Sequence, residues 1–198
     1  MTDDIIVGVV LTHDKIFERY LKSCMMTAAL EAYIVRGNPN TSLAQAYNEI
    51  IKNTTERYII IAHEDIVFGP EIVDVINNLG SGIYGGVGLT SEHKYKWACS
   101  VDPEKPQEVV VFDGCFMIYD RNFGVGFDEE LFTSFHMVID DYCYYMRSLG
   151  HKLYIPHIPG FGHQSGPRVY GGRNTRTYSE ERKKLVRKWS DIFEVVTT

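Results

Sequence analysis

The stretch "RYIIIAHEDIVF", residues Arg57 to Phe68, changes character halfway along its length. Its first half is a continuous apolar run, which is typical of a strand covered on both faces. Its second half presents His63, Glu64 and Asp65 in succession, three groups that core packing disfavours. The sequence predicts a buried strand at 58–62 that ends either in a solvated turn or in a group of ligands for a hard cation such as Mg²⁺ or Mn²⁺.

The sequence on both sides repeats the pattern of a strand followed by a helix. The expected pairs are 5–11 with a helix at 15–29, 32–37 with a helix capped by Thr41 or Ser42, and 58–62 with a helix from Pro70 towards Gly80. Such alternation predicts an α/β fold, a mostly parallel mixed sheet flanked by helices. In these sheets ligands bind beyond the carboxyl ends of the strands, where His63 to Asp65 would lie.

The second half of the chain continues the sheet and adds two helices. Further strands are expected in "GIYGGVGLT", "EVVVFDGCFMIYD" and "HKLYIPHI", with a polar loop at 91–107 that contains Trp97. Apolar residues at helical spacing predict a helix at 138–149, and Ser179 would cap a basic terminal helix.

Composition limits the classes of protein. The 198 residues are 44% hydrophobic and 23% charged, without a linker or low-complexity tract, which indicates one folded domain. Four scattered cysteines, without C-x-x-C spacing, are expected to be buried thiols in a reducing compartment. The acidic N-terminus and its short apolar run fit neither a signal peptide nor a membrane span, so a cytoplasmic protein is expected.

Charge disfavours one class of partner and marks one segment. A net charge of −6 argues against a general nucleic-acid binder. Between Arg173 and Lys188, however, the sequence has seven Lys or Arg residues and only two Glu residues. This segment could form a basic patch that binds phosphate groups or an anionic surface. Arg173 and Arg176 are the expected phosphate contacts, since Arg binds phosphate through two nitrogens.

Three other stretches offer chemical groups. Asp140 and Asp141 enter the first turn of the 138–149 helix, where they would either stabilise the helix dipole or act as a general base towards a hydroxyl. His163, in the small-residue stretch "GHQSG", is either structural or a ligand for an ion or phosphate. Asp113-Gly114 ends a strand, either as a tight turn or as a close approach to a ligand.

Taken in order, these motifs resemble a small GT-A-fold glycosyltransferase of the family 2 type, in particular the bacterial group related to the StrF domain. The resemblance covers Ile5 to about Gly166. It lies in the opening strand that ends at Thr12, "SLAQAYNEII" with Asn48, "YIIIAHEDIVF", "FDGCFMIYDR", "FDEELFTSFHMVIDDYCYYMRSLGHKLYIP" and "HQSG".

The resemblance implies transfer of a sugar from a UDP- or GDP-linked donor to a hydroxyl acceptor, with inversion and with Mn²⁺ or Mg²⁺. Asp65 would match the last acid of the family's metal motif, with Glu64 beside it and His163 as a further ligand. The nucleotide base would lie near Thr12 and His13, and the donor near Asn48, Asp113 and Gly114. Asp140 or Asp141 would be the catalytic base.

The chain departs from the family pattern at the helix start. The first acid of the family's Asp-x-Asp falls on Ile139, Asp141 aligns with the second, and Asp140 is displaced by one residue. Two alternatives therefore stay open: a module that binds nucleotide sugars or glycans without turnover, and a metal-dependent phosphoester hydrolase.

The resemblance also divides the chain. Residues 1–90 would form the nucleotide-sugar half and 91–166 the acceptor and catalytic half, with 167–198 a basic loop and helix on the same domain. The acceptor is left open between capsule, lipopolysaccharide, a small metabolite, a protein and the modified bases of a phage genome.

Overall fold

The computed structural model describes residues 2–38, 40–164 and 175–197. Its core is a seven-stranded sheet in the order β2 (Glu31–Arg36), β1 (Ile5–Leu11), β3 (Tyr58–Ala62), β10 (Phe116–Asp120), β5 (Ile83–Gly85), β11 (Leu153–Ile155) and β8 (Gln107–Val109). All of these strands run in one direction except β10 and β8, which are antiparallel to their neighbours. The predicted α/β fold with a mostly parallel sheet is confirmed.

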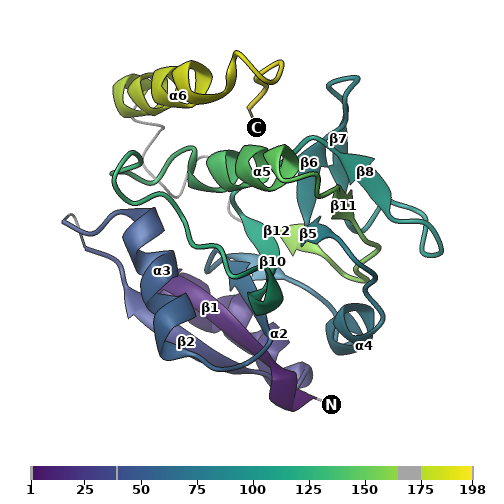
Figure 1. The fold of residues 1–198 in the computed structure, drawn as a ribbon. Coiled ribbons are helices and arrows are strands. Elements are labelled where there is room, and N and C mark those ends of the chain that lie inside the picture. The colour runs from purple at the N-terminus through teal and green to yellow at the C-terminus, as the bar shows by residue number, and fades with distance from the viewer. Residues whose placement is uncertain (1, 39, 165–174, 198) are drawn as a thin grey trace.

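In the described part of the chain, six α-helices accompany the sheet. They are α1 (Asp14–Arg19), α2 (Leu21–Thr27), α3 (Leu43–Asn53), α4 (Ile72–Asn77), α5 (Val138–Ser148) and α6 (Thr175–Trp189), with short 3-10 turns at Thr2–Asp4 and Arg121–Phe123. Figure 1 shows α3 and α5 in front of the sheet and α6 beyond α5. The cover of helices explains why strand β3 is almost entirely apolar, as its residues 59–62 are buried.

The first two βα units follow their sequence signals. Ser42 caps α3 by accepting a hydrogen bond from the Gln45 amide, and the Gln45 side chain accepts one from Ser42 in return. Helix α3 then packs closely on β1, because a Cβ at Gly8 would lie 2.7 Å from the Ile50 side chain. The absence of a side chain at Gly8 therefore sets the distance between helix and sheet.

Several predicted elements have different boundaries. The helix expected at 15–29 is divided at Tyr20 into α1 and α2. The terminal helix begins at Thr175, not at Ser179. Cys99 is exposed, contrary to the expectation of buried thiols, whereas Cys115 and Cys143 are buried.

Two small sheets lie beside the main sheet, and the first breaks a stretch that the sequence predicted to be one strand. The stretch 83–89 leaves the main sheet at Gly86 and continues as β6 (Val87–Leu89), which pairs with β7 (Tyr95–Trp97) and β9 (Val111–Phe112). The second small sheet joins β4 (Ile66–Val67) to β12 (Gly162–His163). Both small sheets lie beside the ends of strands of the main sheet. The polar residues of the candidate site, described below, lie next to them.

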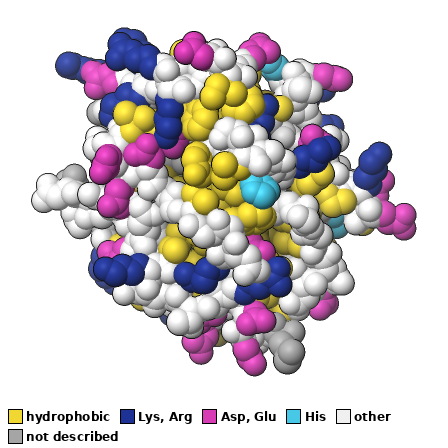
Figure 2. Space-filling view, in the orientation of Figure 1, with side chains coloured by type: hydrophobic (Ala, Val, Ile, Leu, Met, Phe, Trp, Pro, Cys, Tyr) yellow, Lys and Arg dark blue, Asp and Glu magenta, His cyan; other side chains and the backbone are white. Residues whose placement is uncertain are grey.

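Helix α6 closes the structure over α5. Leu185 and Trp189 are its buried apolar anchors, and the Trp189 ring stacks on Tyr144 of α5 at 6.2 Å between centroids. Figure 2 shows Lys and Arg side chains along the margin of this face near α6, next to a central group of apolar side chains. Within the described residues, no helix combines the length and apolar character needed to cross a bilayer.

Candidate metal and donor site

The polar turn after β3 is fixed by backbone hydrogen bonds. The His63 amide donates to the Cys115 carbonyl at 2.9 Å, and the Ile66 amide donates to the His63 carbonyl at 3.2 Å. Strand β12 then pairs His163 with Ile66, and the Gln164 amide donates to the Asp65 carbonyl at 3.0 Å. This pairing brings His163 next to Asp65 although the two lie far apart in the sequence.

His63, Asp65 and His163 converge. One ligand atom of each lies within 4.8 Å of the others, and the Asp65 side chain is fully buried. His163 Nε2 is 3.0 Å from Asp65 Oδ2, yet neither atom, nor Asp65 Oδ1, has a hydrogen-bond partner among the described residues. A buried carboxylate without hydrogen bonds is costly. A bound divalent cation would satisfy these atoms, so the donor set fits a metal ion.

The charges around the cluster suit this interpretation. Burial lowers the pKa of His63, and the neighbouring His163 lowers it further, so His63 is held as the neutral imidazole that binds metals. Burial also lowers the pKa of His163, but Asp65 and Asp113 outweigh it and raise the net pKa. Without a cation, His163 is thus the natural counter-charge of Asp65.

Glu64 has a different role from Asp65. Its buried carboxylate accepts hydrogen bonds from the Thr12 amide at 2.7 Å, the Thr12 hydroxyl at 2.7 Å and the His13 amide at 2.9 Å. His13 Nδ1 lies 2.8 Å from the same group. Glu64 therefore fixes the loop after β1, and its oxygens are occupied by this loop.

Asp113 and Gly114 lie between the cluster and α5. Asp113 Oδ1 accepts a hydrogen bond from the Cys115 amide at 2.9 Å, and its charge acts on both His63 and His163. A Cβ at Gly114 would lie 3.8 Å from Ile139, the second residue of α5. The turn at 113–114 therefore faces the first turn of α5.

Helix α5 begins after a strained residue, Met137, whose φ is +62°. Asp140 and Asp141 follow in its first turn, and both are buried. Asp141 is bound by α6: Trp189 Nε1 donates to Oδ1 at 2.7 Å, and Lys188 Nζ donates to Oδ2 at 3.0 Å. Burial raises the pKa of Asp141 even though these two donors oppose the rise.

Lys188 also donates to Asp128 at 2.9 Å, so it is shared between two carboxylates. We expect Lys188→Met to lower the free energy of unfolding by about 2 kcal/mol, because Asp141 would keep only one of its two donors in a buried place. Burial lowers the pKa of Lys188, but the two acids outweigh burial and raise it. The stabilisation is thus present below the ordinary lysine pKa of 10.5 and is lost as the pH rises through the higher folded value.

Denaturant unfolding of the wild type and of Lys188→Met from neutral to alkaline pH measures this effect. The difference between the two should be constant near neutrality and shrink above pH 10.5. Lys183→Met on the exposed side of α6 is the matched control and should change stability little. Equal losses in both variants would contradict a specific role for Lys188.

Other predicted residues lie in different places. Asn48 donates to the Phe127 carbonyl and to Glu129, both at 2.9 Å, so it joins α3 to the loop before α5. Arg176 is 88% exposed and pairs with Glu180 of its own helix. Arg173 falls outside the described residues. These contacts give Asn48 a structural task that the sequence did not suggest.

Sequence reasoning also missed the partners of Asp141. Lys188 and Trp189 come from a helix 47 or more positions along the chain, and only the tertiary contact reveals them. His63 was part of the polar triplet but was not named as a metal ligand. Its spacing, two residues before Asp65 and on the same turn, was the available signal.

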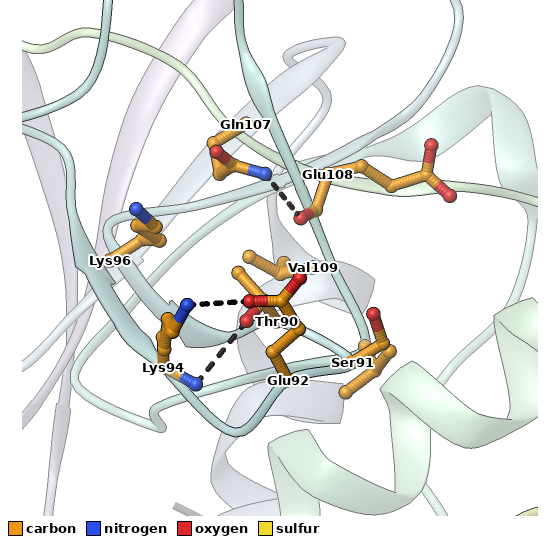
Figure 3. A pocket seen from close by; sticks show the side chains of 9 residues that line it. Thr90, Ser91, Glu92, Lys94, Lys96, Gln107, Glu108 and Val109 are labelled. Atoms are coloured by element: carbon orange, nitrogen blue, oxygen red, sulfur yellow. Dashed lines mark hydrogen bonds and ion pairs between the residues drawn. The ribbon is translucent and has the colours of Figure 1, made fainter.

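Two surface hollows lie away from the cluster. One, of about 380 Å³, is lined by β7 and β8 and by the hairpin at 90–94, with Lys94 bound to Glu92 (Figure 3). The other, of about 350 Å³, lies between α1, α2 and the edge strand β2. Neither hollow includes His63, Asp65 or His163. The site is therefore defined by its converging side chains.

Comparisons place the fold among known structures. No family model matches the chain, and no curated protein matches it by sequence. It superposes on GalNAc-T7, solved with UDP, GalNAc and Mn²⁺, with a TM-score of 0.61 at 12% identity over 94% of this chain and 49% of that one. A mutant of Drosophila beta-1,4-galactosyltransferase 7, complexed with manganese, UDP-Gal and xylobiose, gives 0.57 at 11% identity over 98% of this chain and 82% of that one.

These likenesses define the class of fold. The chain shares its fold with these two glycosyltransferases, the GT-A fold that its motifs led us to expect. It spans about half the length of GalNAc-T7. At such low identity, the fold is shared but substrates and residue roles do not transfer.

Proposed function

We propose that the protein is a metal-dependent glycosyltransferase that moves a sugar from a nucleoside-diphosphate donor to a hydroxyl acceptor with inversion, as family 2-type enzymes do. The observation that supports this most strongly is the cluster of His63, Asp65 and His163 at the carboxyl end of β3. Ligands bind at such strand ends in open α/β sheets. Both structural neighbours were solved with manganese and a uridine nucleotide.

The proposed ligands of Mn²⁺ or Mg²⁺ are His63, Asp65 and His163. When bound, the ion would act as a Lewis acid that stabilises the charge of the leaving diphosphate. The protein's own part is to hold the unpartnered Asp65 oxygens and His163 Nε2 together through the β4–β12 pairing, with His63 fixed beside them by its backbone bond to Cys115. Such preorganisation costs no rearrangement when the donor arrives.

The donor nucleotide is proposed to lie beside the loop after β1. Glu64 fixes Thr12 and His13 there, and the His13 side chain is 46% exposed, so it is accessible to a base or ribose. Asp113 and Gly114 line the neighbouring strand end. Glu64 thus supports the donor site by positioning the residues that would touch the ligand.

Asp140 is proposed as the catalytic base, and Asp141 as its structural neighbour. Ile139 faces Gly114, at the edge of the cluster. Each helical step rotates a side chain by about 100°, so Asp141 lies roughly 200° from Ile139 and points away from this edge. That orientation agrees with its hydrogen bonds to α6. Asp140 lies one step from Ile139 and remains nearer the proposed donor.

The transfer balances as a single displacement. The bond between the anomeric carbon and the diphosphate oxygen breaks, and its electron pair leaves with the diphosphate. The acceptor oxygen bonds to the opposite face of the anomeric carbon while Asp140 takes the hydroxyl proton. Asp140 would return this proton to solvent after the product leaves.

Titration calorimetry with UDP- and GDP-sugars, with and without Mn²⁺, tests the proposal. We expect binding of at least one donor that depends on Mn²⁺, and slow hydrolysis of that donor to free sugar and nucleoside diphosphate. Absence of binding to every donor under both conditions would reject the proposal. Binding without hydrolysis or transfer would instead favour the binding module without turnover.

A further inference from the structure

Trp97 is a large aromatic side chain exposed next to the proposed site. It ends β7 and is 40% exposed, and among the described residues its indole ring packs against no other ring or cation. Its backbone is fixed, because the Trp97 carbonyl accepts hydrogen bonds from the Ser100 amide at 2.8 Å and hydroxyl at 2.9 Å. An exposed indole on a rigid backbone is suited to bind a flat apolar surface.

Strand pairing places Trp97 in line with Asp113. Trp97 pairs with Val87 across β7 and β6, and the Val87 carbonyl accepts a hydrogen bond from the Asp113 amide at 2.9 Å. Adjacent strands lie about 4.8 Å apart, so roughly 10 Å separates the backbones of Trp97 and Asp113. The gap between the indole and the proposed donor site is therefore about wide enough for one sugar ring.

Trp97 and Asp113 lie on the same face of the small sheet formed by β7, β6 and β9. Trp97 shares its face with the paired Val87, whereas Lys96 projects to the opposite face, where it lines the hollow of Figure 3. On β9, the Phe112 ring lies against Gly85 of the main sheet. Successive side chains of a strand lie on opposite faces, so the side chain of Asp113, which follows Phe112, lies on the same face as Trp97.

We propose that Trp97 forms the floor of an acceptor subsite, where it stacks against a sugar ring whose hydroxyl is directed to Asp113 and Asp140. This inference rests on the proposed glycosyltransfer and narrows the acceptor class to a carbohydrate. A pyranose ring has an apolar face of C–H groups that packs on an aromatic plane, while its hydroxyls stay free for the reaction. A phosphate group offers no such apolar face.

The chain allows a direct test, because its two tryptophans differ in exposure. Trp189 is 5% exposed, so iodide quenching of fluorescence reports mainly on Trp97. The probes are methyl glycosides of glucose, galactose, mannose, xylose and N-acetylglucosamine, added with Mn²⁺ and the nucleoside diphosphate that binds. We expect at least one glycoside to protect the fluorescence from iodide and, when the nucleotide sugar replaces the nucleoside diphosphate, to accept the transferred sugar.

Variants then assign the effect to the indole. Trp97→Ala should raise the acceptor KM about tenfold, and Trp97→Phe should raise it less because an aromatic face remains. Nucleotide binding with Mn²⁺ should be unchanged in both, which also shows that they fold. Tyr145→Ala, at an aromatic residue of α5 that is 38% exposed, is the matched control.

The outcomes separate this inference from the proposed function. Intact nucleotide binding with no glycoside protecting Trp97, or with an unchanged acceptor KM in Trp97→Ala, would overturn the subsite and leave the glycosyltransferase proposal standing. Absence of nucleotide binding by the wild-type protein would overturn both the acceptor subsite and the glycosyltransferase proposal. Protection of Trp97 by a glycoside in the wild type, together with a raised acceptor KM for that glycoside in Trp97→Ala, would support the subsite.

Discussion

Asp65→Asn should abolish metal-supported nucleotide binding while leaving the fold intact. The carboxylate has no hydrogen bond among the described residues and lies 3.0 Å from His163 Nε2, which supports our proposal that it binds a cation. An amide has the same shape but binds a divalent cation far more weakly than a carboxylate does. We expect affinity for nucleotide with Mn²⁺ to fall about 100-fold or more, by calorimetry.

Stability should change little. Asp65→Asn removes a buried charge but also the counter-charge of His163, and because these two effects oppose each other the denaturation midpoint should stay close to that of the wild type. Asp74→Asn, at an exposed acid of α4, is the matched control and should preserve binding. Unchanged Mn²⁺-dependent affinity in Asp65→Asn would reject Asp65 as a metal ligand and leave it as the buried ion-pair partner of His163.

Asp140→Asn should lower kcat by roughly a thousandfold, in the range of general-base effects. Metal and donor binding should remain, because Asp140 acts on the acceptor hydroxyl. Asp141→Asn should give a different result, since its carboxylate accepts from Trp189 and Lys188. We expect that variant to lose stability by about 1–3 kcal/mol and to keep much more of its turnover.

The comparison of these two variants decides the assignment. Donor hydrolysis and transfer should be measured at a temperature at which circular dichroism shows both variants folded. A larger loss of kcat in Asp141→Asn than in Asp140→Asn would contradict the proposed base. Normal turnover in both variants would remove the first turn of α5 from the mechanism.

The sequence predicted the fold well wherever local signals agreed with tertiary packing. The apolar run before His63 and the cap at Ser42 both correspond to observed elements. Predictions were wrong where a strand changes sheets at Gly86, because that break depends on pairing with β7 and β9. The division at Tyr20 had no Gly or Pro signal in the sequence.

The candidate site was only partly predictable, for a physical reason. Asp65 and His163 were named from the sequence, and the structure brings them together through a two-residue strand pair. Glu64 and Asp141 have the same chemical type as their neighbours but point elsewhere, towards Thr12 and Trp189. The direction of a side chain at the end of an element depends on tertiary contacts, which the residue type alone does not determine.

The most direct test of the metal site is a crystal soaked with Mn²⁺ and a mixture of nucleoside diphosphates, with anomalous diffraction at the manganese edge. We predict one strong peak bound by His63, Asp65 and His163, with the diphosphate on its open side and the base near Thr12 and His13. A peak at another group of residues, or a nucleotide bound away from the carboxyl end of β3, would contradict it.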